Sequence, residues 1–67
     1  MKYAKLRGLI RANYPTNAEF ARAMGLSCST ISAKLCGKIE WREQEIVRAC
    51  QLLGVPLSEA HLYFFAQ

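Results

Sequence analysis

The sequence predicts a small all-α domain, and three observations support that prediction. The chain has only 67 residues, a length that suits one domain with one small core. Apolar residues recur at the three- and four-residue spacing of helices, so the chain reads as five helices with no strand. Gly25, Gly37 and Gly54 each follow such a segment, where glycine commonly ends a helix. We therefore expect a single domain over residues 1–67.

The first expected helix covers roughly residues 2–13. Leu6 and Ile10 would lie on its buried face, with basic side chains on the opposite face. Tyr14 precedes Pro15, and the residue before a proline disfavours the helical conformation. The helix should therefore end at this dipeptide.

A second helix is expected over about residues 17–24. Thr16 and Glu19 have the Ser/Thr-x-x-Glu spacing of a capping box, which opens a helix. Gly25 can adopt the positive φ that ends the helix and turns the chain sharply. Ala21 is small enough to let a crossing helix approach closely.

A third helix should follow closely, over about residues 28–36. Ser27 can cap its start, because a serine side chain accepts a hydrogen bond from a free backbone N–H of the first turn. Ile31 and Leu35 are four residues apart and would share its buried face. Gly37 offers a left-handed stop after it.

Two further helices complete the expected fold. The fourth covers about 42–53, and the fifth covers about 59–65 with Ser58 as its cap. Trp41, which precedes the fourth, is expected to form a lid on the core because tryptophan buries a large area. The expected core consists of Leu6, Ile10, Phe20, Ala21, Met24, Leu26, Ile31, Leu35, Ile46, Cys50 and Leu53.

Residues 16–38, TNAEFARAMGLSCSTISAKLCGK, resemble the helix-turn-helix of the phage Cro and C1 repressor family, also called the Xre-like family. The resemblance is most specific at Ala21, Gly25, Ile31 and Gly37. It implies that the whole chain is a compact five-helix lambda-repressor-like DNA-binding domain. The third helix would enter the major groove of DNA while the second braces against the backbone.

The resemblance places base readout at four positions of the third helix, namely Cys28, Ser29, Ser32 and Ala33. All four side chains are small. None can form the paired hydrogen bonds with which Arg, Asn or Gln reads a base. Direct readout should therefore be weak per contact, or helped by water and by DNA shape.

Phosphate contacts are expected from Asn17, Ser27, Lys34 and Lys38. Asn17 begins the second helix, where free backbone N–H groups and the helix dipole favour an anion. The Cro and C1 repressor family, which this stretch resembles, uses a polar amide there to contact phosphate. The preference of asparagine for helix starts explains the residue equally well. Capping alone would also explain Ser27.

The distribution of charge also points to a polyanion. Residues 1–38 carry seven basic groups and one acid, which is +6, and residues 39–67 carry two basic groups and four acids, which is −2. The total is the net charge of +4. The positive half contains the helix-turn-helix, as double-stranded DNA would require.

Several classes of function are disfavoured by the sequence. Cys28, Cys36 and Cys50 form no paired motif and His61 is the single histidine, so no metal site is expected. The sequence has no nucleophile with a base at a meaningful spacing, no paired carboxylates near a histidine and no glycine-rich phosphate loop. We therefore expect no enzyme activity, no cofactor and no small-molecule ligand. There is no membrane span and no signal peptide, so we expect a cytoplasmic protein with reduced thiols.

We therefore expect a sequence-specific transcriptional regulator of the Cro/C1 repressor type that occupies operator DNA. The alternative is a protein-interaction module, such as an anti-repressor or an assembly factor, that keeps the fold without specific DNA binding. A homodimer is expected, at least on DNA, because exposed apolar clusters usually mark an interface. Its contact residues would be Leu57, Leu62, Phe64 and Phe65, unless Phe64 or Phe65 folds back into the core of a monomer.

Overall fold

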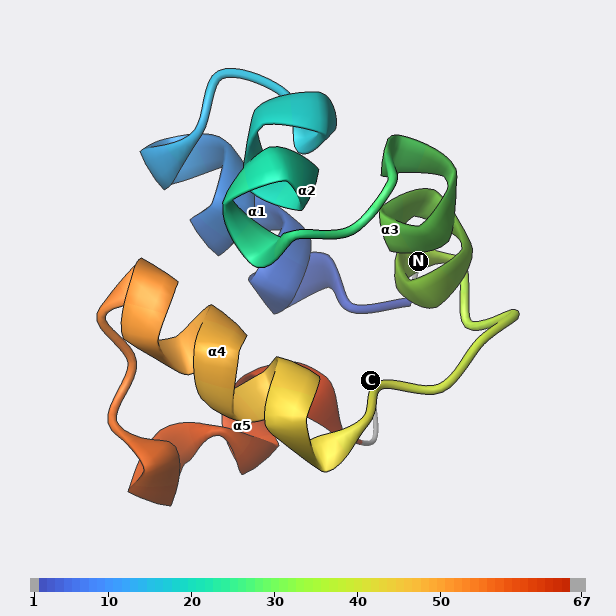
Figure 1. Ribbon diagram of the computed structural model, residues 1–67. Helices are drawn as coiled ribbons and strands as arrows, with labels where there is room; N and C mark the ends of the chain where they lie inside the picture. The colour runs from blue at the N-terminus through green and yellow to red at the C-terminus, as the bar shows by residue number, and fades with distance from the viewer. Residues whose placement is uncertain (1, 66–67) are drawn as a thin grey trace.

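The computed structural model describes residues 2–65, and within that range it is entirely helical with no strand (Figure 1). The all-α prediction is therefore confirmed. The elements in chain order are α1 (Ala4–Asn13), α2 (Asn17–Met24), α3 (Cys28–Leu35), α4 (Glu43–Leu53), the 3-10 helix η1 (Leu57–Glu59) and α5 (His61–Phe64).

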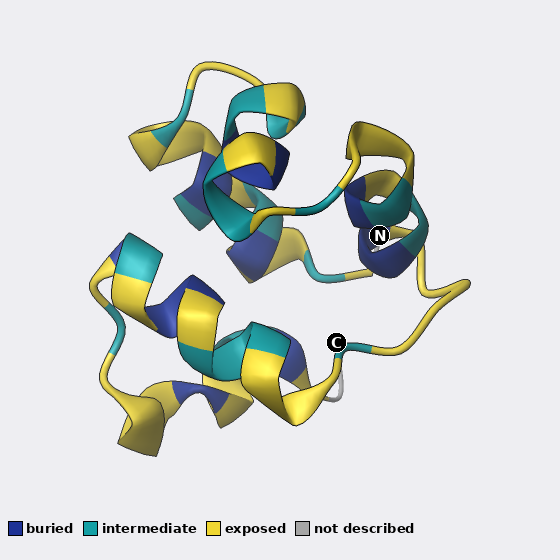
Figure 2. Ribbon diagram, in the orientation of Figure 1, coloured by how far each residue is buried: buried dark blue, intermediate teal, exposed yellow. Residues whose placement is uncertain are grey.

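The helices enclose one core. The α2 helix packs against α1, α3 and α4, and α1 also packs against α4 and α5. Figure 2 shows the buried segments of these helices facing inward and the exposed segments on the outside. None of the helices within residues 2–65 has the length and apolar character needed to cross a membrane. The buried apolar residues are Leu6, Ile10, Phe20, Ala21, Ile31, Leu35, Ala49, Cys50, Leu53, Ala60 and Phe64.

Three residues expected in the core are only partly buried. Met24, Leu26 and Ile46 pack against the core cluster but retain solvent exposure. The small side chains of Ala49 and Ala60 are buried instead. An alanine has too little apolar surface for its burial to stand out in a sequence pattern.

The α1 helix begins two residues later than expected. Tyr3 has a left-handed backbone with φ 58°, so the helix starts at Ala4. Its end agrees with the prediction, since Tyr14 is extended immediately before Pro15.

The turn between α2 and α3 depends on Gly25. Its φ of 75° is left-handed, and the N–H of Leu26 then donates to the carbonyl of Ala21 at 2.9 Å. This is the bond pattern of a Schellman motif, which glycine permits at no steric cost. Ala21 is 2% exposed, as expected for a core residue, and lies on α2, which packs against α3.

The fifth helix expected over 59–65 is present, but it begins later than predicted, and the expected Ser58 cap is wrong. Pro56 is extended, and the carbonyls of Pro56 and Leu57 accept bonds three residues along the chain, so this turn is 3-10. The α helix begins only at His61. Burial of Phe64 fixes this arrangement, because that side chain is 4% exposed.

Candidate nucleic-acid interface

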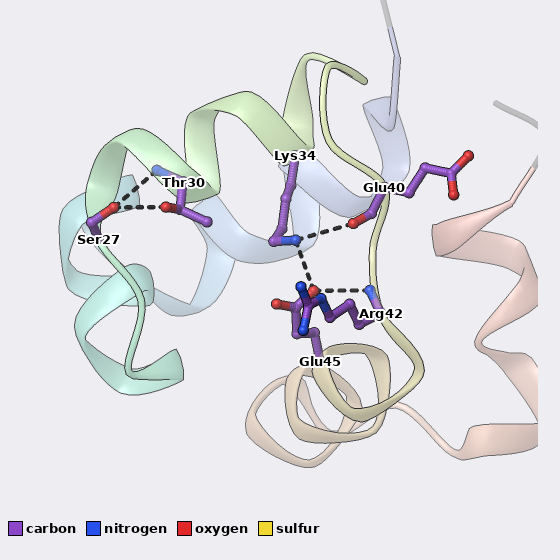
Figure 3. Close-up of polar contacts among 6 residues, drawn as sticks. All are labelled: Ser27, Thr30, Lys34, Glu40, Arg42 and Glu45. Carbon is purple, nitrogen blue, oxygen red and sulfur yellow. Dashed lines mark hydrogen bonds and ion pairs between the residues drawn. The ribbon is translucent and has the colours of Figure 1, made fainter.

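The start of α3 is held by Ser27. Its Oγ accepts from the backbone N–H of Thr30 at 3.1 Å and donates to Thr30 Oγ1 at 2.8 Å (Figure 3). The Oγ atoms of Ser27 and Ser29 are 3.2 Å apart. The capping role predicted for Ser27 is confirmed, and the residue is exposed.

The α3 helix has a buried side and an exposed side. Ile31 and Leu35 are 0% and 1% exposed, as predicted for its inner face. The four residues expected to read bases lie outside this inner face. Cys28, Ser29 and Ser32 are exposed and Ala33 is half-buried.

Lys34 does not lie on the exposed side, so its assignment as a phosphate contact is wrong. It is 2% exposed, and its Nζ forms an ion pair with Oε1 of Glu45 at 2.8 Å (Figure 3). The ammonium also donates to the carbonyl of Glu40 at 3.0 Å. A lysine held in this way has no charge to offer a phosphate.

The end of α3 is closed by two separate interactions. Gly37 has φ 81°, and the N–H of Lys38 donates to the carbonyl of Ala33 at 2.9 Å. Nη2 of Arg7, on α1, donates to the carbonyl of Leu35 at 2.8 Å. The Lys38 side chain itself is exposed.

Asn17 lies at the first position of α2, where it is half-buried. Thr16 Oγ1 accepts from the N–H of Glu19 at 3.2 Å, which is one half of the predicted capping box. A pocket of about 370 Å³ lies here, and it is lined by Arg11, Tyr14, Pro15, Thr16 and Asn17. In Figure 1 the starts of α2 and α3 both lie toward the upper edge of the view.

The basic residues of the first 38 positions are not equally accessible. Lys34 and Arg7 are used internally, as described above, and Arg22 pairs with Glu19 at 3.6 Å. Within residues 2–65, the exposed basic residues of this half for which no such ion pair is found are Lys2, Lys5, Arg11 and Lys38. The charge available to a polyanion is therefore smaller than the sequence count.

A second exposed surface lies near the end of the chain. Leu57, Leu62 and Phe65 are 59%, 40% and 55% exposed. Phe64 is not part of it, so its assignment to a dimer interface is wrong. The Phe64 ring is buried and packs against Trp41. This agrees with the alternative expectation that one of the two phenylalanines folds back into the core.

The protein has two exposed thiols and one buried thiol. Cys28 and Cys36 are exposed. Cys28 is the first residue of α3, and Cys36 directly follows its last residue. Burial raises the pKa of the Cys50 thiol, which therefore remains protonated within the core.

In comparison with known families, a family model matches all of residues 1–67. The chain belongs to the DUF739 family. That family is described as "Protein of unknown function (DUF739)". No curated protein matches the chain.

The residues that sequence reasoning missed in this DUF739 chain are those that hold α3 in place. Arg7 and Glu45 both looked like ordinary surface charges at helical spacing. Their partners are 28 and 11 positions away along the chain, counted to Leu35 and Lys34. No local pattern encodes such contacts. One weak signal was available, since Lys34 directly precedes a residue of the inner face.

Proposed function

We propose that this DUF739 protein is a small DNA-binding transcriptional regulator of the Cro/C1 type, in which α2 and α3 act as a helix-turn-helix. The α3 helix would lie in the major groove and α2 would brace against the DNA backbone. By occupying an operator in the cytoplasm, the protein would block or recruit RNA polymerase. It would need no cofactor and no catalytic residue.

The observation that supports this proposal most is the organisation of α3. The helix follows α2 through a left-handed glycine, buries Ile31 and Leu35, and exposes Cys28, Ser29 and Ser32. A short helix with a polar outer face and a firmly anchored inner face is what groove insertion requires.

Phosphate contacts in this proposal come from Asn17, Ser27 and Lys38. Asn17 lies at the start of α2, where backbone N–H groups and the helix dipole favour an anion. Lys38 contributes a flexible exposed ammonium from the connector after α3. Lys2 and Arg11 are exposed cations of the same basic half and add to the general attraction for DNA.

A homodimer on DNA is also part of the proposal. The eight residues of α3 can reach only a few base pairs, so two copies would be needed for useful specificity. Half-sites in this class lie about 34–36 Å apart on a near-palindromic operator. The exposed side chains of Leu57, Leu62 and Phe65 are the proposed contact between copies.

Selection of bound sequences from random duplex DNA tests this function directly. We expect enrichment of a near-palindromic motif, and a gel shift with that motif should weaken steeply as salt increases. Recovery of no motif, together with equal affinity for all duplexes, would refute sequence-specific regulation.

A protein-interaction role without specific DNA binding is the second candidate. The outer face of α3 favours this candidate, because it has no Arg, Asn or Gln. The burial of Lys34 also removes a positive charge from that face. Heparin retention separates the two candidates. A protein that leaves heparin at low salt and shifts no duplex would fit the interaction module.

A further inference from the structure

Lys34 connects α3 both to α4 and to the segment between them. Its Nζ is 2.8 Å from Oε1 of Glu45 and 3.0 Å from the carbonyl oxygen of Glu40 (Figure 3). The same Glu45 oxygen accepts from the backbone N–H of Arg42 at 2.9 Å. The ammonium also lies 5.9 Å from the centre of the Trp41 ring. One side chain thus joins α3, the first turn of α4 and the connector.

The stability of the fold alone does not call for an ion pair at this place. An apolar side chain of similar volume often stabilises a protein as well as a buried ion pair does. What the ammonium adds is direction, because hydrogen bonds to a carboxylate and a carbonyl form only in a narrow range of geometry. Apolar contacts are non-directional and would tolerate a rotated helix.

The side chain of Lys34 leaves α3 opposite to its exposed face. At about 100° per residue, Ser32 and Cys36 lie about 160° around the helix from Lys34, and Ser29 lies about 140° from it. Any rotation of α3 that breaks the contacts of Lys34 therefore turns the exposed face by the same angle.

We infer that Lys34 is a positioning residue that sets the rotation of α3 relative to α4, and through it the direction of the outer face, without touching DNA. This inference rests on the proposed function. It assigns sequence discrimination in part to a buried ammonium. General attraction for phosphate does not depend on this group, because its charge is already neutralised by Glu45.

The test compares two variants that remove a lysine ammonium. Lys34→Met combined with Glu45→Gln leaves net charge unchanged and no unpaired buried charge, and Lys38→Met removes an exposed ammonium from the connector. Affinities for the selected operator and for random duplex are measured at several salt concentrations. The double variant should lose about tenfold in the operator-to-random ratio, the cost of one mismatched base pair. Its random-duplex affinity and salt slope should not change.

Lys38→Met should instead weaken both affinities and leave their ratio intact. An unchanged ratio in the folded double variant would overturn the positioning role. If the double variant does not fold, Lys34→Met alone replaces it in the test. Its Glu45 carboxylate keeps the bond from the Arg42 N–H, and the Glu45 side chain is 17% exposed to water. If neither variant folds, the role of Lys34 is structural and the inference is overturned.

Amide shifts of the free proteins separate this inference from the proposed function. We expect the folded variant to shift the amide signals at the start of α3, more than one turn from Lys34, and those of residues 36–42. The signals of the last turn of α1 should not change. If the parent protein selects no DNA sequence, the proposed function fails, and these shifts alone decide the positioning role. Unchanged α3 signals would then refute it.

Discussion

The rings of Trp41 and Phe64 meet edge to face, with centroids 5.1 Å apart and planes inclined at 79°. Tyr3 also meets Trp41 edge to face, at 6.4 Å. The indole N–H of Trp41 is buried and forms no hydrogen bond in the described part of the chain, so ring packing holds this residue. The contact joins the connector before α4 to the last helix, and it agrees with the expectation that Trp41 covers the core.

Phe64→Ala should destabilise the fold strongly, because it removes a buried ring from beneath Trp41. Truncations of this kind cost about 3–5 kcal/mol. Urea unfolding at a concentration where the protein is monomeric measures the loss. Phe65→Ala is the matched control, since that ring is 55% exposed, and its cost should be several times smaller. Equal costs would contradict the assignment of Phe64 to the core.

Ala21→Leu should force α2 and α3 apart. Ala21 is 2% exposed on α2, which packs against α3, and overpacking of a core costs about 1–3 kcal/mol. The control is Ala18→Leu, which adds the same atoms at an exposed position of α2. Thermal unfolding of both variants should show a lower midpoint for Ala21→Leu alone. Equal midpoints would mean that α2 and α3 have room for a larger side chain.

Stability in acid should depend on Glu45. Burial raises the pKa of its carboxyl, but hydrogen bonds from Lys34 and the Arg42 backbone, with the attraction of both cations, outweigh burial and lower it below the ordinary value. The ion pair therefore stabilises the fold above the unfolded-state pKa of about 4.3, and this contribution is lost as pH falls through the lower folded-state pKa. Glu45→Gln should lower the free energy of unfolding at pH 7, and the difference from the parent should shrink below pH 4.

Urea unfolding of both proteins across this pH range measures the difference. Glu43→Gln, at an exposed position of the same helical turn, serves as the control and should show a much smaller pH-dependent difference. A Glu45→Gln difference that stays constant from pH 7 into acid would show that the carboxylate charge does not stabilise the fold.

Lys38→Ala should weaken DNA binding alike for every sequence. Loss of one phosphate contact lowers the slope of log affinity against log salt by roughly one unit. Ser29→Ala should instead alter the preferred sequence and leave the salt slope in place. Titrations of labelled duplexes at several salt concentrations measure both quantities. An unchanged slope for Lys38→Ala would remove this lysine from the interface.

Leu57→Glu should dissociate the proposed dimer, because it places a charge in the exposed apolar cluster near the end of the chain. Sedimentation of the free protein and of its complex with operator DNA measures the number of chains. Ser58→Glu adds the same charge at the next, exposed position and should leave association intact. A point substitution is preferable to removal of the C-terminal residues, since that would delete Phe64 from the core. Persistence of the dimer in Leu57→Glu would rule out this interface.

The elements with local signals could be predicted from the sequence. The starts of α2 and α3 follow from the side-chain oxygens of Thr16 and Ser27, and the turn between them follows from Gly25. The end of the chain could not be predicted in this way. Its 3-10 turn and late α helix depend on the burial of Ala60 and Phe64, and that burial involves distant residues.

The candidate interface divides in the same way. Helical periodicity assigned Ile31 and Leu35 to the inner face of α3 and left Ser29 and Ser32 outside, because the repeat of a helix is a local property. The position of Lys34 could be known only from the tertiary structure. Its burial depends on a carboxylate brought to 2.8 Å by the packing of α4.

By itself, then, the sequence determined the helical class, the Gly25 turn and the inner face of α3, since caps, glycines and periodicity act within a few residues. Only the tertiary structure decided which charges remain available to a partner and which aromatic ring completes the core. Burial and ion pairing join residues far apart in the chain, and no local pattern records which of them will meet.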